Sequence, residues 1–248
     1  RIVFSGVGKK KDEVEYALNS GILMFNVESE DELTALNDIA AGIGKKAPIS
    51  LRVNPDVDPQ THPYISTGMK KAKFGVDIKR SIEAYKKAVS LKNLEVVGVD
   101  CHIGSQLTSL TPFVDALAKV REYLDRVLLG EMRKEGAQIR YLDLGGGLGI
   151  NYNDENPPLP DDYAKAIIQG LEGLDVTLIL EPGRVIVGNA GILLTEVQYI
   201  KETDTKKFVI VDGGMNDLIR PALYGSYQAI RRIVETKAEI INADVVGP

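Results

Sequence analysis

Short apolar, β-branched runs alternate along most of the chain with longer segments whose apolar residues recur at helical spacing. The runs are nearly continuous rather than alternating, which is typical of strands in a parallel sheet that helices cover. The predicted strands are residues 2–7, 22–27, 48–53, 95–102, 139–144 and 176–181. The predicted helices between them are residues 11–20, 31–42, 80–91, 112–134 and 161–173. This order indicates a doubly wound sheet or a β/α barrel, and the pattern alone does not separate them.

The pattern changes after Gly191, where strand-like runs follow one another without long helices between them. These runs are Leu193–Lys201, Phe208–Val211 and Ala238–Val246. Strands joined without long helices favour antiparallel pairing. We therefore predict two domains, an α/β domain over residues 1–190 and a β-rich domain over residues 191–248.

Two local features help to place the elements. Ser29 and Glu32 have the spacing of a capping box, which predicts that a helix begins directly after Ser29. The segment Asn54–Lys73 holds three prolines and is unusually long for a connection, and such loops are often functional. It contains His62, which we interpret as a surface residue.

Composition narrows the classes of protein that fit. Of the 248 residues, 44% are hydrophobic and 26% are charged, which is typical of a globular protein and excludes a disordered chain. The net charge of −5, without a basic stripe interleaved with aromatics, argues against nucleic acid as a partner. No apolar run approaches the roughly 18 residues that span a bilayer. The single cysteine, Cys101, excludes an intrachain disulfide, and we expect no metal site and a cytoplasmic protein.

Glycines follow the fifth predicted strand directly. The triplet Gly145–Gly147 leaves its backbone amides open to an anion, as a phosphate-binding turn requires. Its spacing is not that of a dinucleotide-binding fingerprint. The alternative is a tight turn that only packs against its neighbours.

Other polar residues lie at or beyond predicted strand ends. His102 is suited to stack on a planar ligand or to act as an acid or base, although a core histidine fits equally well. Glu181 needs a partner, which is either Arg184 or a protonated ring nitrogen of a cofactor. Arg220 and Tyr224 offer a carboxylate fork and a phenol, with a plain surface role as the alternative.

A phosphate turn, a stacking histidine and a carboxylate for a pyridinium fit pyridoxal 5'-phosphate better than any nucleotide. That chemistry also needs a lysine that holds the cofactor as a Schiff base. No lysine lies at a convincing strand end, since Lys9 and Lys10 follow the first run in a polar turn.

These residues, taken together, resemble a known family. The chain is similar over essentially its whole length to the central portion of the diaminopimelate decarboxylases, within the fold-type III pyridoxal-phosphate-dependent decarboxylases. The motifs that carry the resemblance are Phe4-Ser5-Gly6-Val7-Gly8-Lys9, Asn26-Val27-Glu28-Ser29, Leu51-Arg52-Val53-Asn54-Pro55, Lys73-Phe74-Gly75, His102-Ile103-Gly104-Ser105-Gln106, Leu142-Asp143-Leu144-Gly145-Gly146-Gly147, Glu181-Pro182-Gly183-Arg184, Val211-Asp212-Gly213-Gly214-Met215 and Ile219-Arg220-Pro221-Ala222-Leu223-Tyr224.

The resemblance implies a (β/α)8 TIM-type barrel, in which the six predicted strands are the third to the eighth, followed by part of a β-rich domain. In the family the Schiff-base lysine ends the first barrel strand, which places it upstream of Arg1. A Cys-Glu-Ser-Gly-Asp segment, whose cysteine serves the partner subunit, would follow Pro248. We therefore expect a fragment that is inactive by itself.

The resemblance also assigns roles to residues of the cofactor site. It gives His102 the face of the cofactor ring and places Glu181 at the pyridine nitrogen. It gives the phosphate to Ser105 and the amides of Gly145–Gly147. Gly183 is included in the cofactor site.

The remaining roles concern the substrate and the reaction. Arg184, Arg220 and Tyr224 would bind phosphate or the distal carboxylate of the substrate, and Arg220 is the candidate for specificity. The implied reaction is the last step of lysine biosynthesis, decarboxylation of meso-2,6-diaminopimelate to L-lysine and CO2 by a homodimer. The alternatives are a decarboxylase of arginine, ornithine or carboxynorspermidine, or a barrel that binds pyridoxal phosphate without catalysis.

Overall fold

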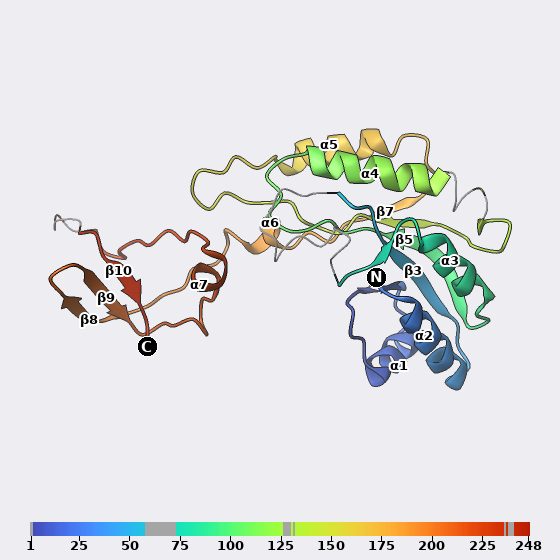
Figure 1. Cartoon of the computed structure of the whole chain (residues 1–248), viewed down its shortest axis with the longest axis horizontal. Coiled ribbons are helices and arrows are strands. Elements are labelled where there is room, and N and C mark those ends of the chain that lie inside the picture. Colours follow the sequence, from blue (N-terminus) through green and yellow to red (C-terminus); the bar gives the residue numbers. More distant parts are fainter. Residues whose placement is uncertain (1, 58–72, 126–129, 131, 236, 238–240) are drawn as a thin grey trace. The chain divides into compact units, whose positions relative to one another are not determined.

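The computed structural model describes residues 2–57, 73–125, 130, 132–235, 237 and 241–248. The chain divides into two compact units, which we describe separately (Figure 1). The first unit is Arg1–Gly149 with Pro157–Ile186, and the second is Ile150–Asn156 with Val187–Pro248. The second unit thus combines the segment from Val187 onward with the short segment Ile150–Asn156. The domain boundary at residue 190 stays a prediction.

The first unit contains the six strands predicted before Gly191 and the long helices predicted between them. Its elements are β1 (Val3–Phe4), α1 (Lys11–Asn19), β2 (Met24–Val27), α2 (Glu30–Gly42), β3 (Ala47–Asn54), β4 (Val76–Asp77), α3 (Ser81–Ser90), β5 (Leu94–Asp100), α4 (Thr111–Tyr123), β6 (Tyr141–Asp143), α5 (Pro160–Gly170) and β7 (Thr177–Ile179), and α6 (Arg184–Val187) follows at the boundary. The predicted helix 112–134 differs most, because α4 ends at Tyr123 and wider π turns begin at Leu124. Most of the loop Asn54–Lys73, with His62, lies outside the described residues.

The strands of the first unit form one parallel sheet in the order β1-β2-β3-β5-β6-β7, with β4 paired to the end of β3. The sheet is strongly curved. The Ser5 hydroxyl, just after β1, donates to Glu181 Oε1, just after β7, at 3.0 Å. In a flat sheet those two edge strands would be about 24 Å apart, since neighbouring strands are about 4.8 Å apart. The first unit is therefore an arc of a β/α barrel and not an open doubly wound sheet.

The hydrophobic core lies between the outer face of this arc and the helices. Outward residues of β2 and β3, such as Phe25, Ile49 and Leu51, belong to this core and are fully buried. The residues between them in sequence, Asn26 and Ser50, point to the inner face, because side chains alternate along a strand. The inner face thus carries polar side chains at these positions. They lie toward the carboxyl ends of the strands.

The helix cap predicted at Ser29 is confirmed. The Ser29 hydroxyl accepts a hydrogen bond from the Glu32 amide at 3.3 Å. The Glu32 carboxylate does not close the predicted box at Ser29, because it accepts from the Glu28 amide at 2.8 Å instead. Its other oxygen forms an ion pair with Lys9, which draws the side chain away from the position that a capping box requires.

The second unit contains β8 (Val197–Glu202), β9 (Lys207–Val211), α7 (Arg220–Tyr224) and β10 (Asp244–Val246), in the sheet order β10-β9-β8. The antiparallel prediction is right for β8 and β9. It is wrong for β10, which pairs with β9 in parallel. The connection between β9 and β10 includes α7 and is long enough for the crossover that parallel neighbours require.

The described residues contain neither a membrane-spanning helix nor a cluster of metal-binding side chains. No helix there is long and apolar enough to cross a bilayer. In the same residues, no group of three or more His, Cys, Asp or Glu side chains has the arrangement of a metal site.

Candidate functional site

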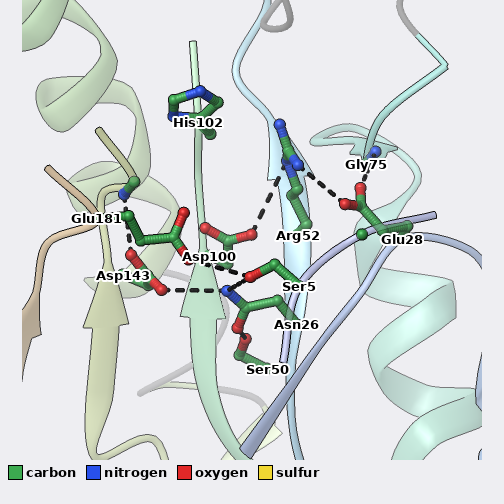
Figure 2. Close-up of polar contacts among 12 residues, drawn as sticks. Ser5, Asn26, Glu28, Ser50, Arg52, Gly75, Asp100, His102, Asp143 and Glu181 are labelled. Atoms are coloured by element: carbon green, nitrogen blue, oxygen red, sulfur yellow. Dashed lines mark hydrogen bonds and ion pairs between the residues drawn. The ribbon is translucent and has the colours of Figure 1, made fainter. Parts of the chain in front are cut away.

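The polar inner residues of the first unit meet at the carboxyl ends of its strands (Figure 2). Asn26 lies in β2 and Arg52 in β3, Asp100 ends β5, and Asp143 ends β6. Glu181 follows β7 and points toward Asp143 and the inner face in Figure 2. Because all these strands are parallel, their carboxyl ends lie at one edge, which is where α/β barrels carry their active sites. The sequence-predicted residues His102 and Glu181 lie at this edge with them.

The glycine triplet after β6 is squeezed between neighbouring strand ends. A Cβ on Gly145 would lie 2.3 Å from Nδ1 of His102, and one on Gly146 would lie 2.3 Å from the backbone oxygen of Glu181. A Cβ on Gly147 would lie 2.4 Å from the backbone oxygen of Gly104. Gly145 and Gly147 also have φ values of +64° and +111°, which favour glycine. The three glycines thus let three neighbouring strand ends approach one another.

Two of the three amides in this turn donate within the chain. The Gly145 amide donates to Asp143 Oδ1 at 2.9 Å, and the Gly146 amide donates to His102 Nδ1 at 3.1 Å. These contacts agree with the alternative interpretation of the triplet as a packed turn. The role of the amides in phosphate binding stays a prediction, and for Gly145 and Gly146 it requires these contacts to be shared or exchanged.

His102 is held as a neutral imidazole. Its Nδ1 accepts the Gly146 hydrogen bond, so a proton on the neutral ring belongs on Nε2. Burial, and after it the nearby positive charge of Arg52, lowers the pKa of His102 from 6.5 to about 4. A neutral, positioned ring suits stacking on a planar ligand. It is a poor source of protons near neutral pH.

Carboxylates from successive strands gather beside Glu181, and sequence reasoning did not single out two of them. Asp100 and Asp143 are 2% and 0% exposed. Burial, followed by the negative charge of Glu181, raises the pKa of Asp143 to about 6. Burial and the charge of Asp143 raise the pKa of Asp100 well above its usual range. The signal in the sequence was an acidic residue at or near the end of each of the fourth, fifth and sixth apolar runs, namely Asp100, Asp143 and Glu181.

Arg52 supplies positive charge to this group of carboxylates. Its Nη1 lies 2.9 Å from Glu28 Oε1, and its Nε lies 3.8 Å from Asp100 Oδ2. Glu28 also accepts the Gly75 amide at 2.8 Å, while the Arg52 guanidinium stacks over the Phe74 ring at 4.9 Å. Arg52 Nη2 and Asp100 Oδ1 are buried without a hydrogen-bond partner among the described residues.

The ammonium of Lys9 is occupied within the protein, so Lys9 is not suited to hold a cofactor covalently. Its ammonium donates to the backbone oxygens of Gly6 and Asn26, each at 2.7 Å, and pairs with Glu32. An ammonium has three donors, and all three are used. With a side chain only 2% exposed, Lys9 is a structural residue.

The other predicted cofactor residues lie on the loops that follow these strands or, for Arg184, at the start of α6. Ser105 is half-buried and follows Gly104, whose backbone oxygen contacts the turn at Gly147. Arg184 donates from Nη1 to Gln106 Oε1 at 3.3 Å. Gly183 is exposed, and a Cβ there would meet no atom within 4 Å, so close packing is not the reason for glycine at this position.

Arg220 lies in the second unit, held between two tyrosines. Its guanidinium is 5.1 Å from the centre of the Tyr224 ring and 5.7 Å from that of Tyr152. Its Nε is buried without a hydrogen-bond partner among the described residues. Tyr152 was not singled out in the sequence, because it is distant from Arg220 along the chain.

Comparison with known proteins identifies the family. The family model described as "Pyridoxal-dependent decarboxylase, pyridoxal binding domain" matches residues 1–188. The chain belongs to this family. It is 54% identical over its whole length to diaminopimelate decarboxylase of Pseudomonas aeruginosa, and it covers 59% of that protein. The chain thus spans about three fifths of the length of the curated relatives that it matches.

Solved structures of pyridoxal-dependent decarboxylases confirm the barrel. Diaminopimelate decarboxylase from Helicobacter pylori, complexed with L-lysine, matches with a TM-score of 0.92 at 48% identity, over all of this chain and 61% of that one. Arginine decarboxylase from Paramecium bursaria Chlorella virus, bound to agmatine, matches with a TM-score of 0.80 at 21% identity, over all of this chain and 64% of that one. The second likeness shows the fold alone.

The residues present fit the cofactor of the pyridoxal-dependent decarboxylases. Around Arg52 the site holds more carboxylates than cations, and burial, followed by the charge of a neighbouring carboxylate, raises the pKa of Asp143 and that of Asp100. A protonated ring nitrogen near Glu181 would offset this excess of negative charge. The neutral ring of His102 suits the face of an aromatic cofactor.

Proposed function

We propose that the full-length protein carrying this chain decarboxylates meso-2,6-diaminopimelate to L-lysine and CO2. The names of the relatives, at 54% and 48% identity over the whole chain, support this substrate. The structural observation that carries the proposal is Arg220, whose buried Nε has no hydrogen-bond partner among the described residues. Diaminopimelate has a second carboxylate, far from the reacting carbon, that such a guanidinium would bind.

Pyridoxal phosphate would be held by residues of the first unit. Glu181 would face the ring nitrogen and keep it protonated, while the His102 imidazole would lie on the ring face. Ser105, Gly183, Arg184 and the turn Gly145–Gly147 would bind the phosphate side. When bound, pyridoxal phosphate supplies an electron sink for the electrons that remain when the carboxylate leaves as CO2.

Tyr152 and Tyr224 would fix the orientation of Arg220. A guanidinium stacked between aromatic rings keeps its edge donors available for a carboxylate fork. The tyrosines thereby reduce the side-chain entropy that Arg220 would lose on binding substrate. Arginine, ornithine and carboxynorspermidine differ from diaminopimelate at this distal end, so Arg220 is the residue that would discriminate among these substrates.

The test is Arg220→Leu in the full-length protein. We expect turnover of diaminopimelate to fall by about 100-fold or more, because a carboxylate in the site would lose its charged partner. Binding of pyridoxal phosphate, followed by absorbance, should stay as in the unmodified protein. Arg231→Leu is the matched control, since Arg231 is an exposed arginine of the same unit.

Two results would contradict the proposal. One is unchanged diaminopimelate turnover in Arg220→Leu. The other is an unmodified protein that decarboxylates arginine, ornithine or carboxynorspermidine in preference to diaminopimelate. A protein that binds the cofactor but turns over none of these substrates would favour the non-catalytic alternative.

We propose further that the full-length protein is a cytoplasmic homodimer and that another part of it supplies the covalent lysine. The occupied ammonium of Lys9 supports the second point. We therefore expect the 248-residue chain alone to be inactive. Light scattering would test the dimer, cell fractionation the location, and an activity assay of the isolated chain the source of the lysine.

A further inference from the structure

A hydrogen-bonded chain of hydroxyl and amide groups leads from the buried interior of the barrel to Glu181. The Ser50 hydroxyl donates to Asn26 Oδ1. Asn26 Nδ2 donates to Ser5 Oγ at 3.0 Å, and the Ser5 hydroxyl donates to Glu181 Oε1 at 3.0 Å. Every donor points the same way along the chain. The last acceptor is therefore the Glu181 carboxylate, and the donors that lead to it come from β3, from β2 and from the residue just after β1.

Asn26 also connects this chain to Asp143. Its second amide proton is donated to Asp143 Oδ2 at 3.1 Å, and the other oxygen of Asp143 accepts the Gly145 amide. The side-chain oxygen and both amide protons of Asn26 are thus used. Asp143 itself lies beside Glu181, whose charge contributes to its raised pKa. Figure 2 shows Ser5, Asn26 and Asp143 pointing toward one another below Glu181.

We propose that Ser5, Asn26 and Asp143 are positioning residues that fix the orientation of Glu181 and place negative charge behind it. This inference rests on the proposed function, in which Glu181 faces the ring nitrogen of pyridoxal phosphate. Ser5 holds one carboxylate oxygen of Glu181 by a hydrogen bond. Asp143 adds negative charge behind Glu181, and Asn26 holds both of these residues in place.

Solvent exposure increases along this network from its buried end at Ser50 to Glu181. Asn26, Ser50 and Asp143 are 0% exposed, Ser5 is half-buried, and Glu181 is exposed. Burying polar groups is costly, and well-packed apolar residues are often at least as stabilising. If this network only stabilised the fold, a hydrogen bond to an exposed carboxylate would contribute little to it. An exposed carboxylate on a loop, by contrast, needs such a network to hold one orientation.

Other charged groups lie near Glu181 and Asp143. Asp100 interacts electrostatically with both of them, and Arg52 and Glu28 act on Asp100. The charges of these three groups remain when Ser5 or Asn26 is changed, so variants of the network isolate its own contribution.

The experiment measures the protonation of the cofactor ring in the full-length protein. Pyridoxal phosphate labelled with 15N in the ring reports the pKa of the ring nitrogen through its chemical shift. We expect Ser5→Ala and Asp143→Asn each to lower that pKa by about one unit, a tenfold change in protonation. Ser5→Ala removes the hydrogen bond that orients Glu181, and Asp143→Asn removes a negative charge that favours the protonated nitrogen. Ser5→Thr keeps the hydroxyl and should behave as the unmodified protein.

Kinetic measurements on the same variants separate positioning from folding. Ser5→Ala should lower kcat about tenfold and change KM less than about twofold, because the lost interaction acts on the reacting ring and not on substrate binding. Ser81→Ala is the matched control. Ser81 is 0% exposed, and its hydroxyl is hydrogen-bonded to the Ile78 carbonyl oxygen and the Tyr123 hydroxyl away from the site, so this change tests lost stability alone.

Glu181→Gln distinguishes failure of the inference from failure of the proposed function. If Glu181→Gln leaves the ring nitrogen protonated, the role of Glu181 itself is wrong. If Glu181→Gln removes the proton while Ser5→Ala and Asp143→Asn do not lower the pKa, the role of Glu181 stands and the inference is wrong. The inference is also wrong if Ser81→Ala lowers the pKa as much as Ser5→Ala does.

Discussion

Two groups of buried polar residues share the inner face of the barrel, and they satisfy their polar atoms differently. The hydroxyl–amide chain consists of Ser50, Asn26 and Ser5 and ends at Glu181. The charged cluster consists of Glu28, Arg52 and Asp100. Hydrogen bonds use every polar side-chain atom of Asn26, whereas Arg52 Nη2 and Asp100 Oδ1 in the cluster have no partner among the described residues.

The difference follows from the chemistry of the groups. A neutral amide offers as many donors as acceptors, so neighbouring strands satisfy it fully. A guanidinium has five donors and a carboxylate accepts several hydrogen bonds, so two or three buried ions leave atoms unsatisfied. The hydroxyl–amide chain is therefore complete within the protein. In the charged cluster, by contrast, the loss of any one residue would leave a buried charge without its partner, so the stability of the protein depends more strongly on each member.

Removing Arg52 should have the largest effect on stability. Arg52→Met leaves Glu28 and Asp100 as buried carboxylates without their cation, and we expect the free energy of unfolding to fall by about 3–5 kcal/mol. Urea denaturation of the cofactor-free, full-length protein measures this change.

The surface pair Arg140–Glu95 is a matched control for that prediction. Its nitrogen and oxygen atoms are 2.9 Å apart, as in the Arg52–Glu28 pair, but both side chains are more than two fifths exposed. Arg140→Met should cost about 1 kcal/mol or less, because water screens exposed charges. Equal losses in the two variants would show that burial does not distinguish the cluster from a surface pair.

The next effect concerns the pH dependence of stability and one neighbour of each group, His102 near Arg52 and Asp143 bonded to Asn26. The folded pKa of His102 is about 4 and its ordinary value is 6.5, so its contribution is lost as pH falls from 6.5 through 4. The folded pKa of Asp143 is about 6 and its ordinary value is 3.8, so its contribution is lost as pH rises from 3.8 through 6. Each contribution is on the order of 3 kcal/mol, and between pH 4 and 6 they offset one another.

Single variants should expose each of these contributions in the cofactor-free protein. His102→Gln leaves only the Asp143 contribution, so stability should fall relative to the unmodified protein as pH rises from 4 to 6. Asp143→Asn leaves only the His102 contribution, so relative stability should rise over that window. Denaturation midpoints at several pH values measure both slopes, and slopes of the same sign in the two variants would contradict the assignment.

A methyl group in the glycine turn should have a smaller effect. Gly146→Ala places a Cβ 2.3 Å from the backbone oxygen of Glu181, and we expect a loss of about 1–3 kcal/mol together with weaker cofactor binding. Gly42→Ala, at the end of α2, meets no atom within 4 Å and should not destabilise the protein. Titration with pyridoxal phosphate and urea denaturation check both variants, and normal cofactor affinity in Gly146→Ala would count against the close approach.

The smallest effect should come from the buried end of the hydroxyl–amide chain. Ser50→Ala removes one neutral donor to Asn26, and we expect a loss of about 1 kcal/mol. Urea denaturation measures this loss. A loss as large as that of Arg52→Met would mean that the neutral chain and the charged cluster do not differ in the way their chemistry implies.

Much of the fold was predictable, because strands and helices are set by local patterns of apolar residues. The sequence also indicated Glu181 and His102, since both follow strands whose ends meet in any parallel sheet. It did not indicate Asn26, Ser50 or Arg52. These residues alternate with buried apolar residues inside strands, and the runs around them read as continuous apolar segments.

The sequence by itself determined the succession of elements, the cap at Ser29, the glycine turn after β6 and the family. Only the tertiary structure decided that the sheet curves until Ser5 meets Glu181, that β10 runs parallel to β9, and that Lys9 is fully occupied. The physical reason is range. Apolar periodicity and capping act over a few residues, whereas the contact between Ser5 and Glu181 joins opposite edges of the sheet and exists only when all the strands between them have assembled.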